Sequence, residues 1–181
     1  MGTDFILYNS FKIENALTED EKLIINGSCA HFGVKNLNEE VVDANSFNEF
    51  FSLYDDGKLV PALNYNHTDQ IIGGIDSIEK KDNGLFMTAH LNKNVPLCDM
   101  LIPNILSGDI SGLSTEGFVK NGVDGVEFLD EGGYYVKDFL LTAVAVVSTP
   151  ADWNAQFTVR NYLNTHPKQE LKYISPSIIL L

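Results

Sequence analysis

The chain has 181 residues, of which 25 are acidic and 12 basic, and its formal net charge is -13. This length suits one ordinary domain with its own hydrophobic core, and a composition of 44% hydrophobic and 20% charged residues is typical of a globular protein. The acidic balance and a single arginine, Arg160, argue against a nucleic-acid binder, because phosphate recognition depends on basic side chains.

Short segments rich in β-branched and aromatic residues, separated by Asn, Asp and Gly, predict a chain of strands joined by turns. The first residues, 1–6, carry no basic region or long apolar stretch, so we expect neither an export signal nor a lipid anchor. The expected strands are residues 23–33, 71–80, 85–92, 112–120, 126–129, a strand from Tyr134 onward, and 138–148.

Turn residues predict that four of these strands form two hairpins. Asp82-Asn83-Gly84 separates 71–80 from 85–92, and Gly132-Gly133 precedes the strand that starts at Tyr134. The longest apolar run, Phe139–Val147, is far shorter than the ~20 residues of a membrane-spanning helix. We interpret it as a buried strand and expect no membrane contact.

Three helices are expected. Ser46 and Glu49 have the spacing of a capping box, which predicts a helix over residues 46–54. Pro96 and Gly108 bound a second, which Pro103 should kink or split. A third is expected from Thr149-Pro150 to about residue 163. Residues 1–163 would then form one domain, followed by a C-terminal extension over residues 164–181.

Ser114 is the first candidate for a nucleophile. In Gly112-Leu113-Ser114-Thr115-Glu116-Gly117 its hydroxyl lies between glycines, where the backbone can approach a substrate closely. From local sequence alone, a serine in a turn is the commoner explanation. A serine hydroxyl is a poor nucleophile unless a base takes its proton, and histidine titrates in the appropriate range.

His67 is the best candidate for that base among the four histidines. Polar residues flank it just before a predicted strand, a position from which loop side chains commonly face a cleft. His31 and His90 lie in strand-like runs, where a packing role is the simpler interpretation, and His166 falls in the C-terminal extension.

Other kinds of site fit the sequence less well. An α/β-hydrolase needs Gly-x-Ser-x-Gly with its histidine after the serine, which the order of His67 and Ser114 contradicts. His67 and Asp69 could be metal ligands of a metal-dependent hydrolase, but no third ligand stands at a recognisable spacing. Cys29 and Cys98 lack the spacing of a disulfide framework or a zinc site. We therefore expect no metal and no cofactor.

Four segments occur in a characteristic order between residues 24 and 157. They are Asn26–Gly33 followed by Glu40–Asp43 and Ser46-Phe47, then Asn66–Gly73 followed by Asp82–Leu85, then Ile110–Phe118, and finally Ala145–Asp152. Together they resemble the prohead serine proteases of tailed bacteriophages, which are similar in fold to the herpesvirus assembly proteases. The resemblance implies a mainly β fold, a closed or nearly closed antiparallel β-barrel with a few peripheral helices.

The resemblance also implies a mechanism. His67 would deprotonate Ser114, whose oxygen attacks a peptide carbonyl, while backbone amides near the glycine-bearing loops stabilise the oxyanion. Thr115 is a weaker alternative nucleophile, because the sequence carries one more residue before Gly117 than some relatives do.

The third catalytic group stays open. Family members often carry an acidic and a small polar residue on the closing strand, and Ala143 and Ala145 occupy those positions here. Asp138 lies on the same predicted strand and is a candidate, although its distance from Ala143 places it on the opposite face unless a bulge intervenes. Glu116 shares a face with Ser114 and could orient the histidine or the substrate, although a surface carboxylate is the simpler explanation.

The function implied by the resemblance is a serine endopeptidase that cleaves scaffold protein, capsid protein and itself. It would act in the host cytoplasm, inside the assembling prohead, without binding nucleic acid, and self-association into a homo-oligomer would be compatible with this role. The alternative, suggested by Ala143, is an inactive capsid-assembly or scaffold-like module with the same fold.

Overall fold

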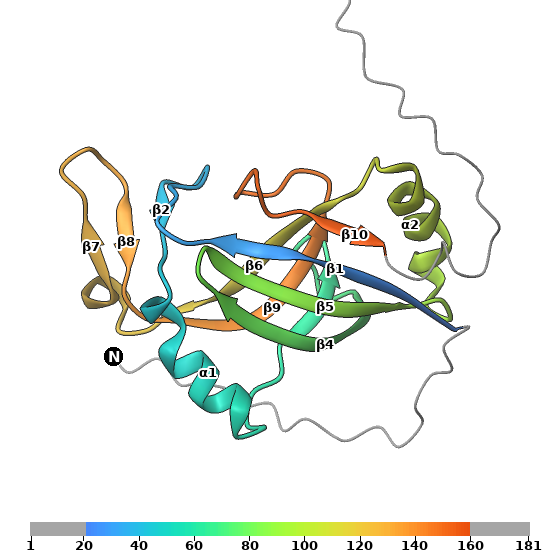
Figure 1. Cartoon of the computed structure of the whole chain (residues 1–181), viewed down its shortest axis with the longest axis horizontal. Helices are drawn as coiled ribbons and strands as arrows, with labels where there is room; N and C mark the ends of the chain where they lie inside the picture. The colour runs from blue at the N-terminus through green and yellow to red at the C-terminus, as the bar shows by residue number, and fades with distance from the viewer. Residues whose placement is uncertain (1–20, 160–181) are drawn as a thin grey trace, which may run out of the picture.

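The computed structural model describes residues 21–159, and its main element is a seven-stranded sheet that curls into a half-barrel (Figure 1). The strand order is β10-β1-β5-β4-β3-β9-β6. The strands are β1 (Lys22–His31), β3 (Ala62–Tyr65), β4 (Ile71–Lys81), β5 (Gly84–Asn92), β6 (Gly112–Val119), β9 (Phe139–Val147) and β10 (Phe157–Val159). All neighbours pair antiparallel except β3 and β9, which are parallel. The expected mainly β fold is therefore confirmed, with one parallel pair that the sequence did not predict.

The two outermost strands approach each other at one end of the half-barrel. Gly112 forms an isolated antiparallel bridge with Gln156, and the amide of Leu113 donates to the carbonyl of Ala155 (2.8 Å). Pro150 packs so closely that a Cβ on Gly112 would lie 2.7 Å from its Cδ. Only glycine fits this position, which fixes the start of β6 against the 150–156 loop.

Two helices and a small second sheet surround the half-barrel. They are α1 (Asn48–Asp55), preceded by the 3-10 turn η2 (Asn45–Phe47), α2 (Pro96–Ser107), the 3-10 turn η3 (Gly122–Gly125), and the strands β2 (Glu40–Val41), β7 (Val126–Phe128) and β8 (Tyr134–Val136). Figure 1 shows α2 at the end of the molecule away from β7 and β8. None of the helices in residues 21–159 is both long and apolar enough to cross a membrane.

The core includes one face of β5, whose sequence shows why the chain forms this strand. Leu85, Met87, Ala89 and Leu91 alternate with partly exposed residues and are all at most 3% exposed. Such a period-two pattern fits a strand with one face against the core. Both expected hairpins, β4–β5 and β7–β8, are confirmed.

The helix expected over residues 46–54 is present as η2 and α1, but its capping box and a split of α2 at Pro103 are not. The predicted capping box does not form, because the Ser46 hydroxyl is buried and donates to the carbonyl of Val136 (2.6 Å) instead of capping the helix. Pro103 lies inside α2 without splitting it, and the helix ends at Gly108 with φ 85°. Its ring is exposed, so water can replace the backbone hydrogen bond that proline removes.

The third expected helix is also wrong within the described residues. Residues 148–156 form turns, and β10 pairs antiparallel with β1, where Ile25 faces Val159. A long-range strand pair has overridden a local helix signal that began at Thr149-Pro150. The remainder of that predicted helix, the 163/164 domain boundary and the C-terminal extension lie outside the described residues.

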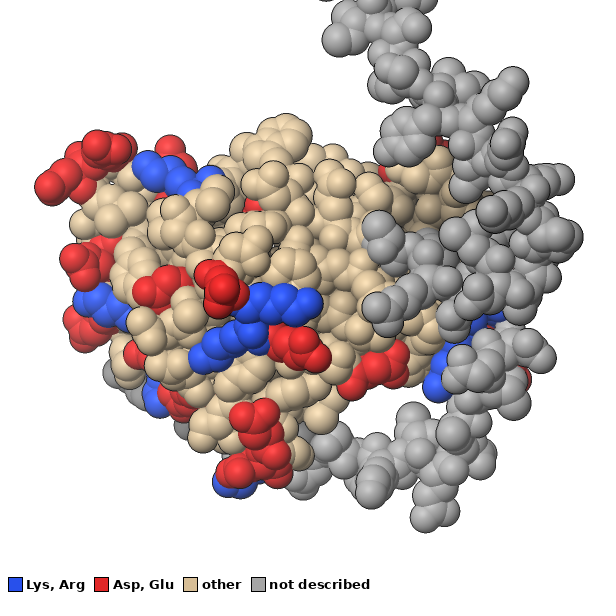
Figure 2. Space-filling model, viewed as in Figure 1, with Lys and Arg blue, Asp and Glu red and all other residues tan. Residues whose placement is uncertain are grey.

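The charges of one face are mixed. Figure 2 shows Lys side chains lying among Asp and Glu, with no continuous basic area in that view. Lys120 illustrates the pattern, since its Nζ lies 2.6 Å from Glu49 Oε2. That hydrogen bond raises the pKa of Lys120 and connects the end of β6 to α1.

Candidate active site

His67 lies in the tight turn that joins β3 to β4. The amide of Thr68 donates to the carbonyl of Tyr65, and the two central residues, Asn66 and His67, have φ values of 54° and 56°. Positive φ at both central positions defines a type I′ turn, for which Asn-Gly is the preferred pair. Asn66 fits this preference, whereas a left-handed conformation at His67 costs about 1–2 kcal/mol. The fold thus holds His67 in a strained backbone conformation.

Ser114 reaches the same place from β6. It is 7% exposed and lies opposite Ala145 of β9, whose methyl group leaves space above the sheet. His67 Nε2 lies 3.0 Å from Ser114 Oγ, and His67 Nδ1 lies 3.2 Å from Glu116 Oε2. An ionised carboxylate can only accept, so it selects the tautomer with a proton on Nδ1 and leaves Nε2 free to accept from the serine hydroxyl.

Glu116 has a second donor besides His67. The amide Nδ2 of Asn64, on β3, donates to the same oxygen, Oε2, at 3.1 Å. Asn64 is 4% exposed, whereas the side chains of Glu116 and His67 are each 42% exposed. Sequence reasoning missed Asn64, although it is a polar residue in a run that the structure shows as a buried strand.

The structure does not bring Asp138 to His67. The backbone carbonyl of Asp138 accepts a hydrogen bond from the amide of Lys120. The negative charge of the Asp138 side chain adds to the effect of Glu49 in raising the pKa of Lys120. Asp138 precedes β9, while the carboxylate against the imidazole comes from Glu116 on the neighbouring strand.

The other described histidines pair with aspartates rather than packing among apolar residues. His31 Nδ1 lies 2.8 Å from Asp152 Oδ2, which also accepts from the His31 amide, and His90 Nδ1 lies 2.7 Å from Asp76 Oδ1. His166 lies outside the described residues. Within residues 21–159, no three His, Cys, Asp or Glu side chains are grouped so that they could hold a metal ion.

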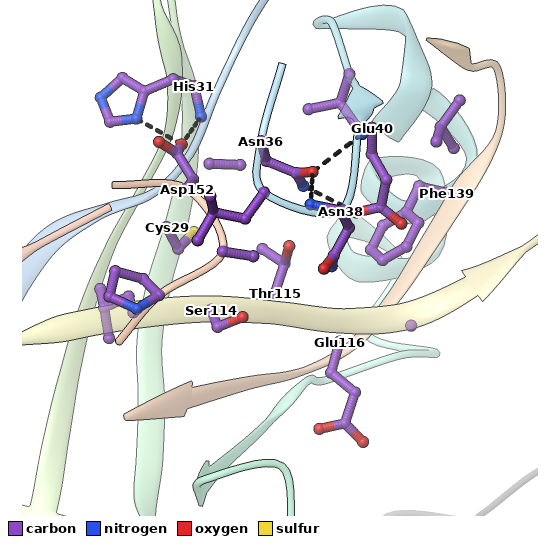
Figure 3. A pocket seen from close by; sticks show the side chains of 18 of the residues that line it. Cys29, His31, Asn36, Asn38, Glu40, Ser114, Thr115, Glu116, Phe139 and Asp152 are labelled. Atoms are coloured by element: carbon purple, nitrogen blue, oxygen red, sulfur yellow. Dashed lines mark hydrogen bonds and ion pairs between the residues drawn. The ribbon is translucent and has the colours of Figure 1, made fainter. Parts of the chain in front are cut away.

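A cavity of about 530 Å³ opens beside Ser114. Its wall includes His67, Ser114, Asn36, Glu40, His31 and Asp152. Figure 3 shows Thr115 pointing toward the Asn36 and Asn38 side of this cavity, while Glu116 points to the other side of β6. Ser114, His67 and Glu116 all line this cavity, so a substrate that enters it can reach Ser114.

Cys29 also lines the cavity but is a poor nucleophile. It is 2% exposed, and burial raises its pKa to about 12. A thiol with this pKa stays protonated near neutral pH, and only the thiolate reacts readily. Ser114 is thus the better placed nucleophile in this part of the chain.

The strain at His67 leads to a prediction about stability. His67→Gly and His67→Ala both remove the imidazole, but only glycine relieves the left-handed conformation. We expect His67→Gly to unfold with a free energy about 1 kcal/mol higher than that of His67→Ala, measured by urea denaturation.

Asp69 provides the matched control, because its φ is not positive. There glycine should be less stable than alanine, since only the entropy of the unfolded chain changes. If His67→Gly were no more stable than His67→Ala, the turn would not be strained.

The chain is similar to known proteins both in sequence and in fold. Residues 9–169 match a family model described as caudovirus prohead serine protease. Among solved structures, the bacteriophage T4 capsid assembly protease, gp21, is similar with a TM-score of 0.55 and 22% identity, over 70% of this chain and 82% of that one. A search of curated protein sequences found no match.

A second similar structure is the KSHV protease in complex with a hexapeptide phosphonate inhibitor, with a TM-score of 0.52 and 10% identity. The match covers 77% of this chain and 65% of that chain, which is less than two thirds of its length. At these identities the two structures show a shared fold alone. The expected likeness to the herpesvirus protease fold is confirmed.

Proposed function

Because the chain belongs to the family of caudovirus prohead serine proteases, we propose that it is a serine endopeptidase of capsid maturation in which Ser114 is the nucleophile and His67 the general base. The family and the two protease folds support a capsid peptidase. The observation that carries the catalytic assignment is the 3.0 Å contact between His67 Nε2 and Ser114 Oγ.

The proposed reaction has two halves. As Ser114 Oγ bonds to the peptide carbonyl carbon, its proton passes to His67 Nε2, and the resulting imidazolium is stabilised by Glu116. His67 then gives this proton to the leaving amine when the peptide C–N bond breaks. Water, deprotonated by His67, hydrolyses the acyl-enzyme and frees Ser114.

The position of Ser114 on an outer strand supports a peptide substrate. The amide of Leu113 points away from β9 and donates to Ala155. Backbone direction alternates along a strand, so the amide and carbonyl of Thr115 point to the same side, beside the cavity, where no described residue bonds to them. An extended peptide could pair there and place its carbonyl carbon near Ser114.

The proposed substrates follow from the family. They are the scaffold, the N-terminal region of the major capsid protein and the protease itself, inside the prohead. Inside the particle the protease and its substrates would be held close together. This proximity would allow even a slow enzyme to complete the cleavages. Self-association of this chain remains a prediction.

A substrate-independent experiment tests the catalytic assignment. A biotinylated fluorophosphonate reacts with an activated serine: Oγ bonds to phosphorus, fluoride leaves, and the histidine takes the hydroxyl proton. We expect the native protein to be labelled at Ser114, identified by peptide mass spectrometry, and His67→Ala to be labelled at least about a hundredfold more slowly.

Heat-denatured protein serves as the control for nonspecific labelling. Labelling that is absent, or equally fast in native and denatured protein, would contradict the proposal and favour the inactive assembly module. Peptide cleavage that a chelator abolishes and that the fluorophosphonate leaves unchanged would instead favour a metal-dependent hydrolase using His67 and Asp69.

A further inference from the structure

Asn64 is a buried polar residue in a position where an apolar side chain would pack at lower cost. It is 4% exposed, and its neighbour Leu63 on β3 is fully buried. Its Oδ1 is buried without a hydrogen-bond partner among the described residues. An unsatisfied buried polar atom typically costs about 1–3 kcal/mol. Such a cost is usually tolerated where the residue has a functional role.

The side-chain hydrogen bond that Asn64 makes among the described residues reaches the proposed catalytic set. Nδ2 donates to Glu116 Oε2 at 3.1 Å, and the same oxygen lies 3.2 Å from His67 Nδ1. Glu116 has several rotatable bonds and is 42% exposed. A contact with an equally exposed imidazole would leave this carboxylate free to rotate into solvent. The bond from Asn64 supplies an anchor from the rigid part of the sheet.

The register of the sheet makes this contact possible. β9 lies between β3 and β6, and the side chain of Asn64 must pass over it to reach Glu116. Asn64 lies beside Ala145, while Ala143 lies directly opposite Glu116. These two residues carry only methyl groups, so they leave space for the amide to cross.

We propose that Asn64 is a positioning residue that holds the Glu116 carboxylate where it accepts the Nδ1–H of His67. The proposal rests on the function proposed above for Ser114 and His67. Asn64 does not touch the reacting atoms; it acts through Glu116. A chain with an apolar residue at position 64 would fold, but its histidine would be oriented less often for catalysis.

The test measures the rate of fluorophosphonate labelling of the full-length protein. Asn64→Leu keeps the approximate volume and removes the donor, and we expect labelling about tenfold slower, within the range seen for residues that orient a functional group. In a Glu116→Ala background, Asn64→Leu should slow labelling by less than about twofold, because its partner is already gone.

Asn26 offers the matched control. It lies partly buried on β1, its Oδ1 accepts from Thr88 Oγ1 at 2.9 Å, and its Nδ2 is also buried without a partner. The Asn26→Leu variant should be labelled at a rate within about twofold of the native rate. This control separates the loss of the donor at position 64 from the general effect of removing an asparagine from a strand.

The outcomes separate this inference from the function on which it rests. If the unmutated protein is not labelled, the catalytic assignment fails. If it is labelled and Asn64→Leu reacts at the native rate, or slows equally with and without Glu116, the positioning role is overturned. Should Asn64→Leu fail to fold, Asn64→Asp keeps the shape, and a labelling rate equal to that of the native protein would overturn the proposal in the same way.

Discussion

Replacement of Ser114 by alanine is expected to lower kcat/KM for peptide cleavage by about 10³-fold or more, because it removes the hydroxyl proposed to form the acyl-enzyme. The Ser114 hydroxyl oxygen lies 3.0 Å from His67 Nε2, so the substitution removes this hydrogen bond but changes the packing little. The variant should therefore fold normally. The measurement is cleavage of the proposed substrates, scaffold and capsid precursors, followed by mass spectrometry of the new termini.

Thr115→Ala is the control for that experiment, since Thr115 is the alternative nucleophile next in the chain. Its side chain points to the Asn36 side of the cavity rather than toward Glu116 (Figure 3). Cleavage by Thr115→Ala should stay within a fewfold of the native rate. Full activity of Ser114→Ala together with an inactive Thr115→Ala would reverse the assignment.

Replacement of Glu116 by alanine is expected to lower kcat/KM by about 10²- to 10⁴-fold, the scale of losses when the acid behind a catalytic histidine is removed. Without the carboxylate at 3.2 Å, His67 can carry its proton on either nitrogen and the imidazolium loses its partner. The same cleavage assay measures the effect, and KM should change less than kcat, because Glu116 acts on the imidazole of His67.

Asp138→Ala provides the matched carboxylate control, with activity expected within about twofold of native. A loss as large as that of Glu116→Ala would restore Asp138 as the third catalytic group. Ala143→Glu tests the same idea in reverse: position 143 faces Glu116 across the β6–β9 pair, so a glutamate there should recover part of the activity of Glu116→Ala.

The parts of the fold that sequence predicted are those with local signals. β4 and β5 were found from a turn and a period-two pattern, and the nine-residue apolar run did become β9. β3 was missed because it is only four residues long and includes the polar Asn64. The Thr149-Pro150 helix was wrong because pairing of β10 with β1, far apart in sequence, outweighs local preference.

The site was predictable only in part. The segments around His67 and Ser114 resemble those of a known protease family, and this resemblance indicated the pair. The alternation of side chains along a strand placed Glu116 on the same face as Ser114. Nothing local distinguishes Glu116 from a solvent-facing carboxylate, since its role depends on the turn that carries His67 over β6. Asn64 could not be found this way, because its contact crosses an intervening strand whose alanines become relevant only once the register is known.

The bridge between Gly112 and Gln156 joins the strand that carries Ser114 to a segment that is translated after it. A nascent chain that still lacks residues 150–159 has no partner for the start of β6, no β10 beside β1, and no wall of the cavity around Pro150 and Asp152. Its nucleophile is translated well before the segment that completes its surroundings, and non-local strand pairing forms late. We therefore expect an unfinished chain to lack the proposed peptidase activity until residues 150–159 have been translated.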